Sequence, residues 1–144
     1  MGSPAENLTL RDIPSTREFV FRRLDSGPRK GDLAIVNAHP QGSELQYFLG
    51  SRSNVPLSED YSLVALVRGL NPAKWVMILA GTTTIGTEAA VEYVCQPNSL
   101  EELLAKLSVS PTGETKPFEA VLRVKVARGV PVESEIVALR GGQF

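Results

Sequence analysis

The sequence contains few of the residues that mark metalloproteins or disulfide-stabilised proteins. Its 144 residues include a single cysteine, Cys95, and a single histidine, His39. One cysteine excludes an intrachain disulfide, and one histidine with no cysteine nearby offers no metal-binding cluster. We therefore expect no metal and no cofactor, a hydrogen-bonded loop histidine, and a cytoplasmic protein from a reducing compartment.

Long apolar runs and an excess of charge are also missing. No run approaches the roughly 20 residues that a membrane-spanning helix needs, and the chain does not start like a signal peptide. The formal net charge of −1 gives no long-range attraction to nucleic acid. We therefore expect no membrane contact and no direct nucleic-acid binding by this chain. The length and the hydrophobic content of 42% predict one globular domain over residues 1–144.

Hydrophobic patterns predict several strands. Residues 61–69 and 74–81 are nearly continuous apolar runs, which are typical of strands covered on both faces. Residues 118–126 and 133–140 alternate between apolar and polar, which predicts a C-terminal antiparallel hairpin with its polar face in water. Further strands are expected at residues 18–24, 32–38 and 44–50, the last two forming a hairpin.

Two helices are expected between these strands. Apolar spacing from residue 85 to 95 predicts a first helix, with Thr84 as its N-cap, Glu88 in its first turn and Cys95 on its apolar face. Asn98 and Glu101 form a capping-box pattern for a second helix over residues 99–107. The fold class is therefore α/β, with helices packed on a mixed sheet and a disordered tail over residues 141–144.

The stretch LAGTTTIGTEAA, residues 79–90, is the best candidate for a binding site. A buried strand leads into two glycines and four threonines, and a helix starts there. Helix N-termini carry unpaired N–H groups that bind anions. The hypothesis is that these residues bind a small polar or anionic ligand: Gly81, Thr82, Thr83, Thr84, Gly86 and Thr87. The alternative is a well-capped strand-to-helix turn.

The same loop departs from the phosphate-binding loop of nucleotide hydrolases. Gly81 and Gly86 have that motif's spacing, but Thr87 stands where it needs lysine and Glu88 where it needs a hydroxyl. ATP or GTP hydrolysis is therefore not expected.

A second candidate segment is GSPAEN, residues 2–7, in which Gly2, Ser3, Glu6 and Asn7 would form the opposite wall of the site. The alternative is a flexible terminus, because Met-Gly-Ser is a common start of recombinant chains. Elsewhere, Arg22, Arg23, Arg29 and Lys30 form a modest basic patch interrupted by Asp25 and Asp32, which we interpret as a solvated face. Glu59 and Asp60 are expected in a loop before a strand.

Together, GSPAEN, LAIVNAHPQGSE and ILAGTTTIGTEAAVEYV resemble the C-terminal domain, of unassigned function, found in bacterial winged-helix transcriptional regulators. The resemblance implies that residues 2–7 are native and that a first strand lies upstream of them. It also implies that the two glycine loops follow parallel strands and meet across one crevice.

The first functional hypothesis is therefore a non-enzymatic, sensor-like domain without catalytic residues. Two alternatives stay open. One is an enzyme acting on a nucleotide or glycosyl phosphate through Glu6 or Glu88. The other is an interaction module that forms a homodimer through an exposed sheet edge.

Overall fold

The computed structural model describes residues 16–52, 55–69, 71, 73–107 and 116–141. Residues 1–15, which include the predicted site residues Gly2, Ser3, Glu6 and Asn7, lie outside the described part of the chain. Within that part the chain forms strands and helices in this order: β1 (Phe19–Arg23), β2 (Leu33–Asn37), β3 (Tyr47–Phe48), β4 (Glu59–Arg68), β5 (Trp75–Gly81), α1 (Thr84–Cys95), α2 (Pro97–Lys106), β6 (Phe118–Ala127) and β7 (Val130–Gly141).

The strands form two sheets, one with the order β1-β2-β3 and one with the order β5-β4-β6-β7. Every strand pair in the described residues is antiparallel. The predicted α/β class and the C-terminal hairpin, now β6 and β7, are confirmed. The expected single mixed sheet is replaced by two antiparallel sheets. Among the described residues the strands β1, β2 and β3 pair only with one another, and the chain then forms a second sheet in which β6 returns beside β4 after β5, α1 and α2.

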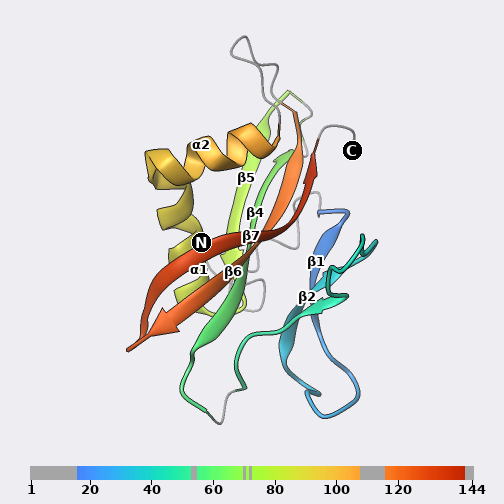
Figure 1. Cartoon of the computed structure of the whole chain (residues 1–144). Coiled ribbons are helices and arrows are strands. Elements are labelled where there is room, and N and C mark those ends of the chain that lie inside the picture. Colours follow the sequence, from blue (N-terminus) through green and yellow to red (C-terminus); the bar gives the residue numbers. More distant parts are fainter. Residues whose placement is uncertain (1–15, 53–54, 70, 72, 108–115, 142–144) are drawn as a thin grey trace.

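The larger sheet is the middle of three layers (Figure 1). The helices α1 and α2 cover one face, and the smaller sheet covers the other. Alternate residues of β4 therefore enter two different cores. Leu63 and Ala65 pack with Phe19 and Phe48 of the smaller sheet, whereas Val64 packs on the helix side. The prediction that these apolar runs are covered on both faces holds for β4 and for the second half of β5, whereas Met77 in the first half of β5 is exposed.

The hairpin of β6 and β7 turns through two residues, Arg128 and Gly129. Their φ values are 53° and 77°, so both lie in the left-handed region that a tight type I′ hairpin turn requires. Both strands are longer than the alternating pattern indicated. Gly141 belongs to β7 instead of the predicted disordered tail, and residues 142–144 lie outside the described part.

The helix boundaries differ from the predictions by one or two residues. Thr83, not Thr84, is the N-cap of α1, and its side chain accepts a hydrogen bond from Gly86 N. Glu88 therefore lies beyond the first helical turn, and Cys95 at the last position of α1 is exposed. Pro97 opens α2 instead of only ending α1, since proline needs no N–H at a first helical position. The expected cap at Asn98 is wrong for that reason.

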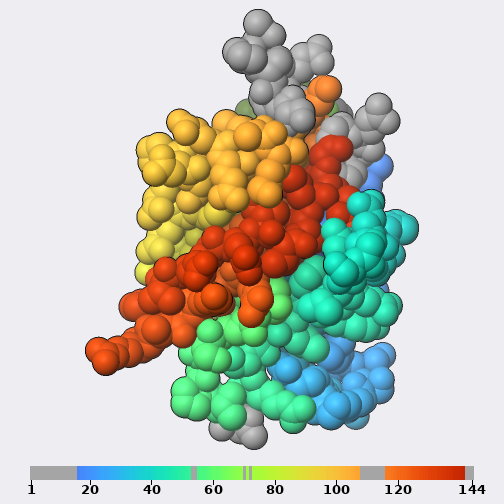
Figure 2. Space-filling view, viewed as in Figure 1, coloured from blue at the N-terminus to red at the C-terminus, as the bar shows by residue number. Residues whose placement is uncertain are grey.

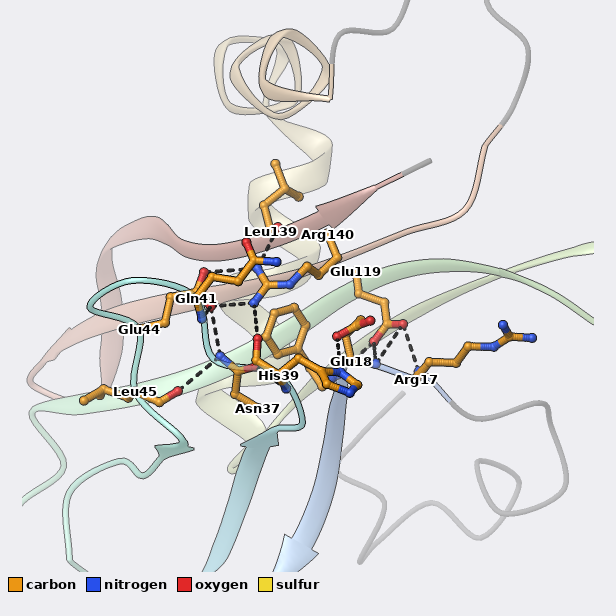
Figure 3. A network of polar contacts seen from close by, with 11 residues as sticks. Arg17, Glu18, Asn37, His39, Gln41, Glu44, Leu45, Glu119, Leu139 and Arg140 are labelled. Atoms are coloured by element: carbon orange, nitrogen blue, oxygen red, sulfur yellow. Dashed lines mark hydrogen bonds and ion pairs between the residues drawn. The ribbon is translucent and has the colours of Figure 1, made fainter. Parts of the chain in front are cut away.

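A network of polar contacts joins the two sheets (Figure 3). The Arg140 guanidinium of β7 binds both carboxylate oxygens of Glu44, with Nη1 at 3.0 Å from Oε2 and Nη2 at 2.5 Å from Oε1. Arg140 Nη2 also donates to His39 O, and the guanidinium lies 5.2 Å from the ring centroid of Phe19. His39 is a hydrogen-bonded loop residue, as predicted, with Nδ1 at 3.0 Å from Glu18 Oε2.

Glu119 of β6 holds the start of β1 in the same network. Its carboxylate accepts hydrogen bonds from the backbone N–H groups of Arg17, Glu18 and Phe19 at 2.9 to 3.3 Å. Glu119 is 1% exposed, so the polar face of β6 does not point wholly into water as the alternation predicted. Glu119 stands at a polar position of the alternating pattern, and that pattern does not indicate that a second sheet covers this side chain.

Burial raises the pKa of the Glu119 carboxyl. The three backbone N–H donors act in the opposite direction, but the effect of burial on the pKa is larger. A carboxyl whose pKa is higher in the folded state binds protons more readily there, so folding is favoured below the unfolded pKa and loses this contribution as pH rises. We expect the free energy of unfolding to fall less steeply above pH 4.5 in the Glu119→Gln variant than in the natural chain. Urea unfolding at a series of pH values measures this. Parallel pH profiles of the two proteins would contradict the assignment.

Candidate anion-binding cleft

The start of α1 is bound by a carboxylate of the protein itself. Asp60 of β4 is fully buried beside the loop that joins β5 to α1. Asp60 Oδ2 accepts from Thr83 N at 3.2 Å and from Thr83 Oγ1 at 2.6 Å, and Oδ1 accepts from Tyr61 N at 2.8 Å and from Thr82 Oγ1. This carboxylate occupies the position at the helix N-terminus where the sequence suggested an external anion. The prediction that Asp60 lies in a loop is wrong, because β4 begins at Glu59.

The two glycines of the loop allow a close intramolecular approach. A Cβ atom on Gly86 would lie 2.3 Å from Asp60 Oδ2, and one on Gly81 would lie 2.5 Å from the backbone of Gly86 and Thr87. Gly81 and Gly86 therefore let β5, the start of α1 and the Asp60 carboxylate pack together. A bulky residue at position 86 would disturb the fold itself, so it cannot serve as a test of ligand binding alone.

Most donors of the loop are also used within the protein. Gly81 N donates to Thr87 Oγ1 at 2.9 Å, and Thr82 N donates to Tyr61 O at 3.1 Å. The Thr87 hydroxyl is buried and donates to Thr83 O at 3.2 Å. Thr84 is exposed. Of the six predicted loop residues, Thr82 and Thr83 line a cleft.

That cleft has a volume of about 480 Å³ and opens at the end of the molecule where β5 passes into α1. Its walls come from the end of β1, the loop between β1 and β2, the segment around Gly50–Arg52, and the start of β4. In Figure 1 the β1–β2 loop and the loop before β4 lie at the lower end of the molecule, away from α2. A cleft of this volume is within the range that small-molecule sites occupy.

Three arginines line the cleft, one from each of three segments: Arg23, Arg29 and Arg52. Arg23 is the last residue of β1, on the same side of the strand as Phe19 and Phe21, which pack toward the larger sheet. Its Nη1 donates to Gly31 O at 3.0 Å. Arg29 Nη2 donates to Gly50 O at 2.8 Å. Within the described residues the Arg52 side chain makes no hydrogen bond or ion pair.

The two carboxylates of the cleft are held within the protein in different ways. Asp32 is ion-paired, with Oδ2 at 2.5 Å from Arg29 Nε. Asp60 accepts hydrogen bonds from the neutral loop donors described above. The positive charges of Arg23 and Arg52 therefore have no carboxylate partner among the described residues, while each guanidinium keeps further N–H donors. The cleft has the charge and the donors to bind an anion. The sequence grouped Arg23 and Arg29 in a solvated basic patch and gave no role to Arg52, which lies far from them along the chain.

Other predicted groups lie away from the cleft. Glu88 is exposed on α1 and does not line it. In the described part of the chain, no cluster of histidine, cysteine or acidic residues could hold a metal ion, and no helix is long and apolar enough to cross a membrane.

Comparisons of this chain with protein families, with curated proteins and with solved structures find no match.

Proposed function

We propose that this chain is a non-enzymatic ligand-binding domain that binds a small anion in the arginine cleft. The observation that carries the proposal is that Arg23, Arg29 and Arg52 line one cleft with only two carboxylates among its described residues, of which Asp32 is ion-paired and Asp60 is hydrogen-bonded within the protein. Guanidinium groups bind carboxylate and phosphate oxygens through parallel N–H donors, and these charge-assisted bonds are the strongest that side chains make with anions. Thr82 and Thr83 remain part of this proposed site.

We further propose that the domain is the sensory part of a bacterial transcriptional regulator. This step is supported only by the resemblance of the segments GSPAEN and AGTTTIGTEAA to the C-terminal domain of such regulators. Anion binding would then be the signal that the domain passes to a partner domain.

Binding of inorganic phosphate, measured by calorimetry at low ionic strength, tests the anion site. Charge-assisted hydrogen bonds contribute about 1.5–3 kcal/mol, so Arg23→Ala or Arg52→Ala is expected to weaken phosphate binding about tenfold or more. Arg22→Ala is the matched control, because Arg22 is the exposed neighbour of Arg23 and does not line the cleft. Equal losses in the Arg22 and Arg23 variants would mean unspecific charge attraction and would contradict the site.

The enzyme alternative has less support from the geometry. Glu88, one of its two candidate carboxylates, is exposed outside the cleft, and Glu6 lies outside the described residues. Release of inorganic phosphate from a bound phosphate ester would establish the enzyme and contradict a purely binding role.

Homodimerisation stays a separate prediction. β5 and β7 are the edge strands of the larger sheet, and the tip of the β6–β7 hairpin projects from the body of the molecule (Figure 2). Val130 and Val132 are exposed at that end of β7. Exposed edge strands with apolar side chains tend to pair with another chain, and sedimentation at rising protein concentration would detect a dimer.

A further inference from the structure

The two walls of the arginine cleft have opposite hydrogen-bonding capacity. The side chains of Arg23, Arg29 and Arg52 offer only donors, because a guanidinium has five N–H groups and no acceptor. The Asp32 carboxylate on the same wall is held by Arg29. The hydrogen-bonding capacity of Thr82 and Thr83 is different, because both residues donate hydrogen bonds to Asp60.

Each threonine hydroxyl has one proton, and both protons are directed to Asp60. Thr82 Oγ1 donates to Asp60 Oδ1, and Thr83 Oγ1 donates to Asp60 Oδ2 at 2.6 Å. Thr83 N also donates to Asp60, so it has no proton left for a ligand. The Thr83 hydroxyl oxygen also accepts from Gly86 N, so only one of its lone pairs remains for a ligand. These two half-buried threonines line the cleft and can therefore accept hydrogen bonds from a ligand but cannot donate them.

We infer that the ligand is an anion that also carries hydroxyl groups, of the class of sugar phosphates and polyol phosphates. This inference rests on the proposed anion-binding function. The anionic group would bind the arginines, and a hydroxyl of the same molecule would donate to Thr82 or Thr83. A bare anion would use one wall only, since an anion without a proton has no donor for the threonine oxygens. The volume of about 480 Å³ is large enough for a molecule of this size, and both sets of side chains line the same cleft.

Calorimetry with a matched pair of ligands tests this inference on the full chain. Glycerol 3-phosphate and propyl phosphate share the phosphate and the three-carbon skeleton, and they differ in the two hydroxyl groups. One net hydrogen bond is worth about 1 kcal/mol, so glycerol 3-phosphate is expected to bind at least about fivefold more tightly. Glycerol alone is expected not to bind.

A pair of variants locates the effect. Thr82→Val removes the hydroxyl with little change in volume, whereas Thr82→Ser keeps it. The preference for glycerol 3-phosphate over propyl phosphate is expected to fall in the valine variant and to remain in the serine variant. If the valine variant does not fold, the ligand pair measured on the natural chain still decides.

The outcomes separate this inference from the proposed function. Equal binding of the two phosphate esters would overturn the hydroxyl preference and leave the anion site intact. Failure of inorganic phosphate and both esters to bind would overturn the anion site, and the hydroxyl preference with it.

Discussion

Replacing Asp60 by alanine is expected to lower the free energy of unfolding by about 3–5 kcal/mol, one of the two largest effects expected for this chain. The carboxylate accepts four hydrogen bonds, two from the backbone N–H groups of Tyr61 and Thr83 and two from threonine hydroxyls. The hydroxyls can turn to other acceptors, but the two N–H groups are fixed by β4 and by the start of α1. Removing Asp60 therefore leaves Thr83, the N-cap residue of α1, without the acceptor of its N–H group.

Urea unfolding followed by the fluorescence of Trp75, the only tryptophan of the chain, measures this effect. Asp60→Asn is expected to lie between the natural chain and the alanine variant. Tyr61 N binds one carboxylate oxygen and Thr83 N binds the other, so an amide nitrogen must face one of these donors. Glu88→Ala, exposed on the same helix, is the control and is expected to change stability by less than about 0.5 kcal/mol. A stable Asp60→Ala variant would show that α1 does not depend on this carboxylate.

Replacing either Arg140 or Glu44 by an uncharged residue is expected to lower the free energy of unfolding by about 3–5 kcal/mol, because it leaves the largely buried charge of the other residue without its partner. The side chains of Arg140 and Glu44 are only 9% and 17% exposed. Arg140→Met keeps much of the apolar stem and removes the charge, so its effect reports mainly on the ion pair. The exposed pair of Lys125 and Glu133 on the same β6–β7 hairpin is the control, and Lys125→Ala is expected to cost less than about 1 kcal/mol.

The same ion pair makes stability depend on pH. The hydrogen bonds that Glu44 accepts from Arg140 lower the pKa of the Glu44 carboxyl to about 2, against an ordinary value of 4.5. A lowered pKa in the folded state stabilises the fold above the ordinary value, and this contribution is lost as pH falls from 4.5 toward 2. The Glu44→Gln variant is expected to lose this part of the acid dependence. Equal acid unfolding profiles for the natural chain and the variant would contradict the role of the pair.

The parts of the fold that follow from local patterns could be predicted from the sequence. The apolar runs of β4 and β5, the helical spacing of α1 and the alternation of β6 and β7 each indicate an element within one segment. The existence of a separate small sheet could not be predicted in this way. Its strands pack on the larger sheet through Phe19, Ile35 and Phe48, and the alternation of these strands does not say which surface covers them.

The candidate site was predicted only in part for the same reason. The glycines and threonines between β5 and α1 suggested a place for an anion, and the structure fills that place with Asp60, a residue 22 or 23 positions from its threonine partners. Arg23, Arg29 and Arg52 come together through the β1–β2 loop and the segment before β4. No spacing rule relates these positions, because their meeting depends on how the two sheets pack.

The most direct test of the anion site is a titration of the isotope-labelled chain with inorganic phosphate, followed by the shifts of its backbone amide signals in NMR spectra. The expected result is a saturable set of shifts centred on Arg23, Gly31 to Leu33 and Gly50 to Arg52, the segments that form the cationic wall of the cleft. Saturable shifts centred on another surface, or no saturable shifts at all, would contradict the proposal that the arginine cleft is the ligand site.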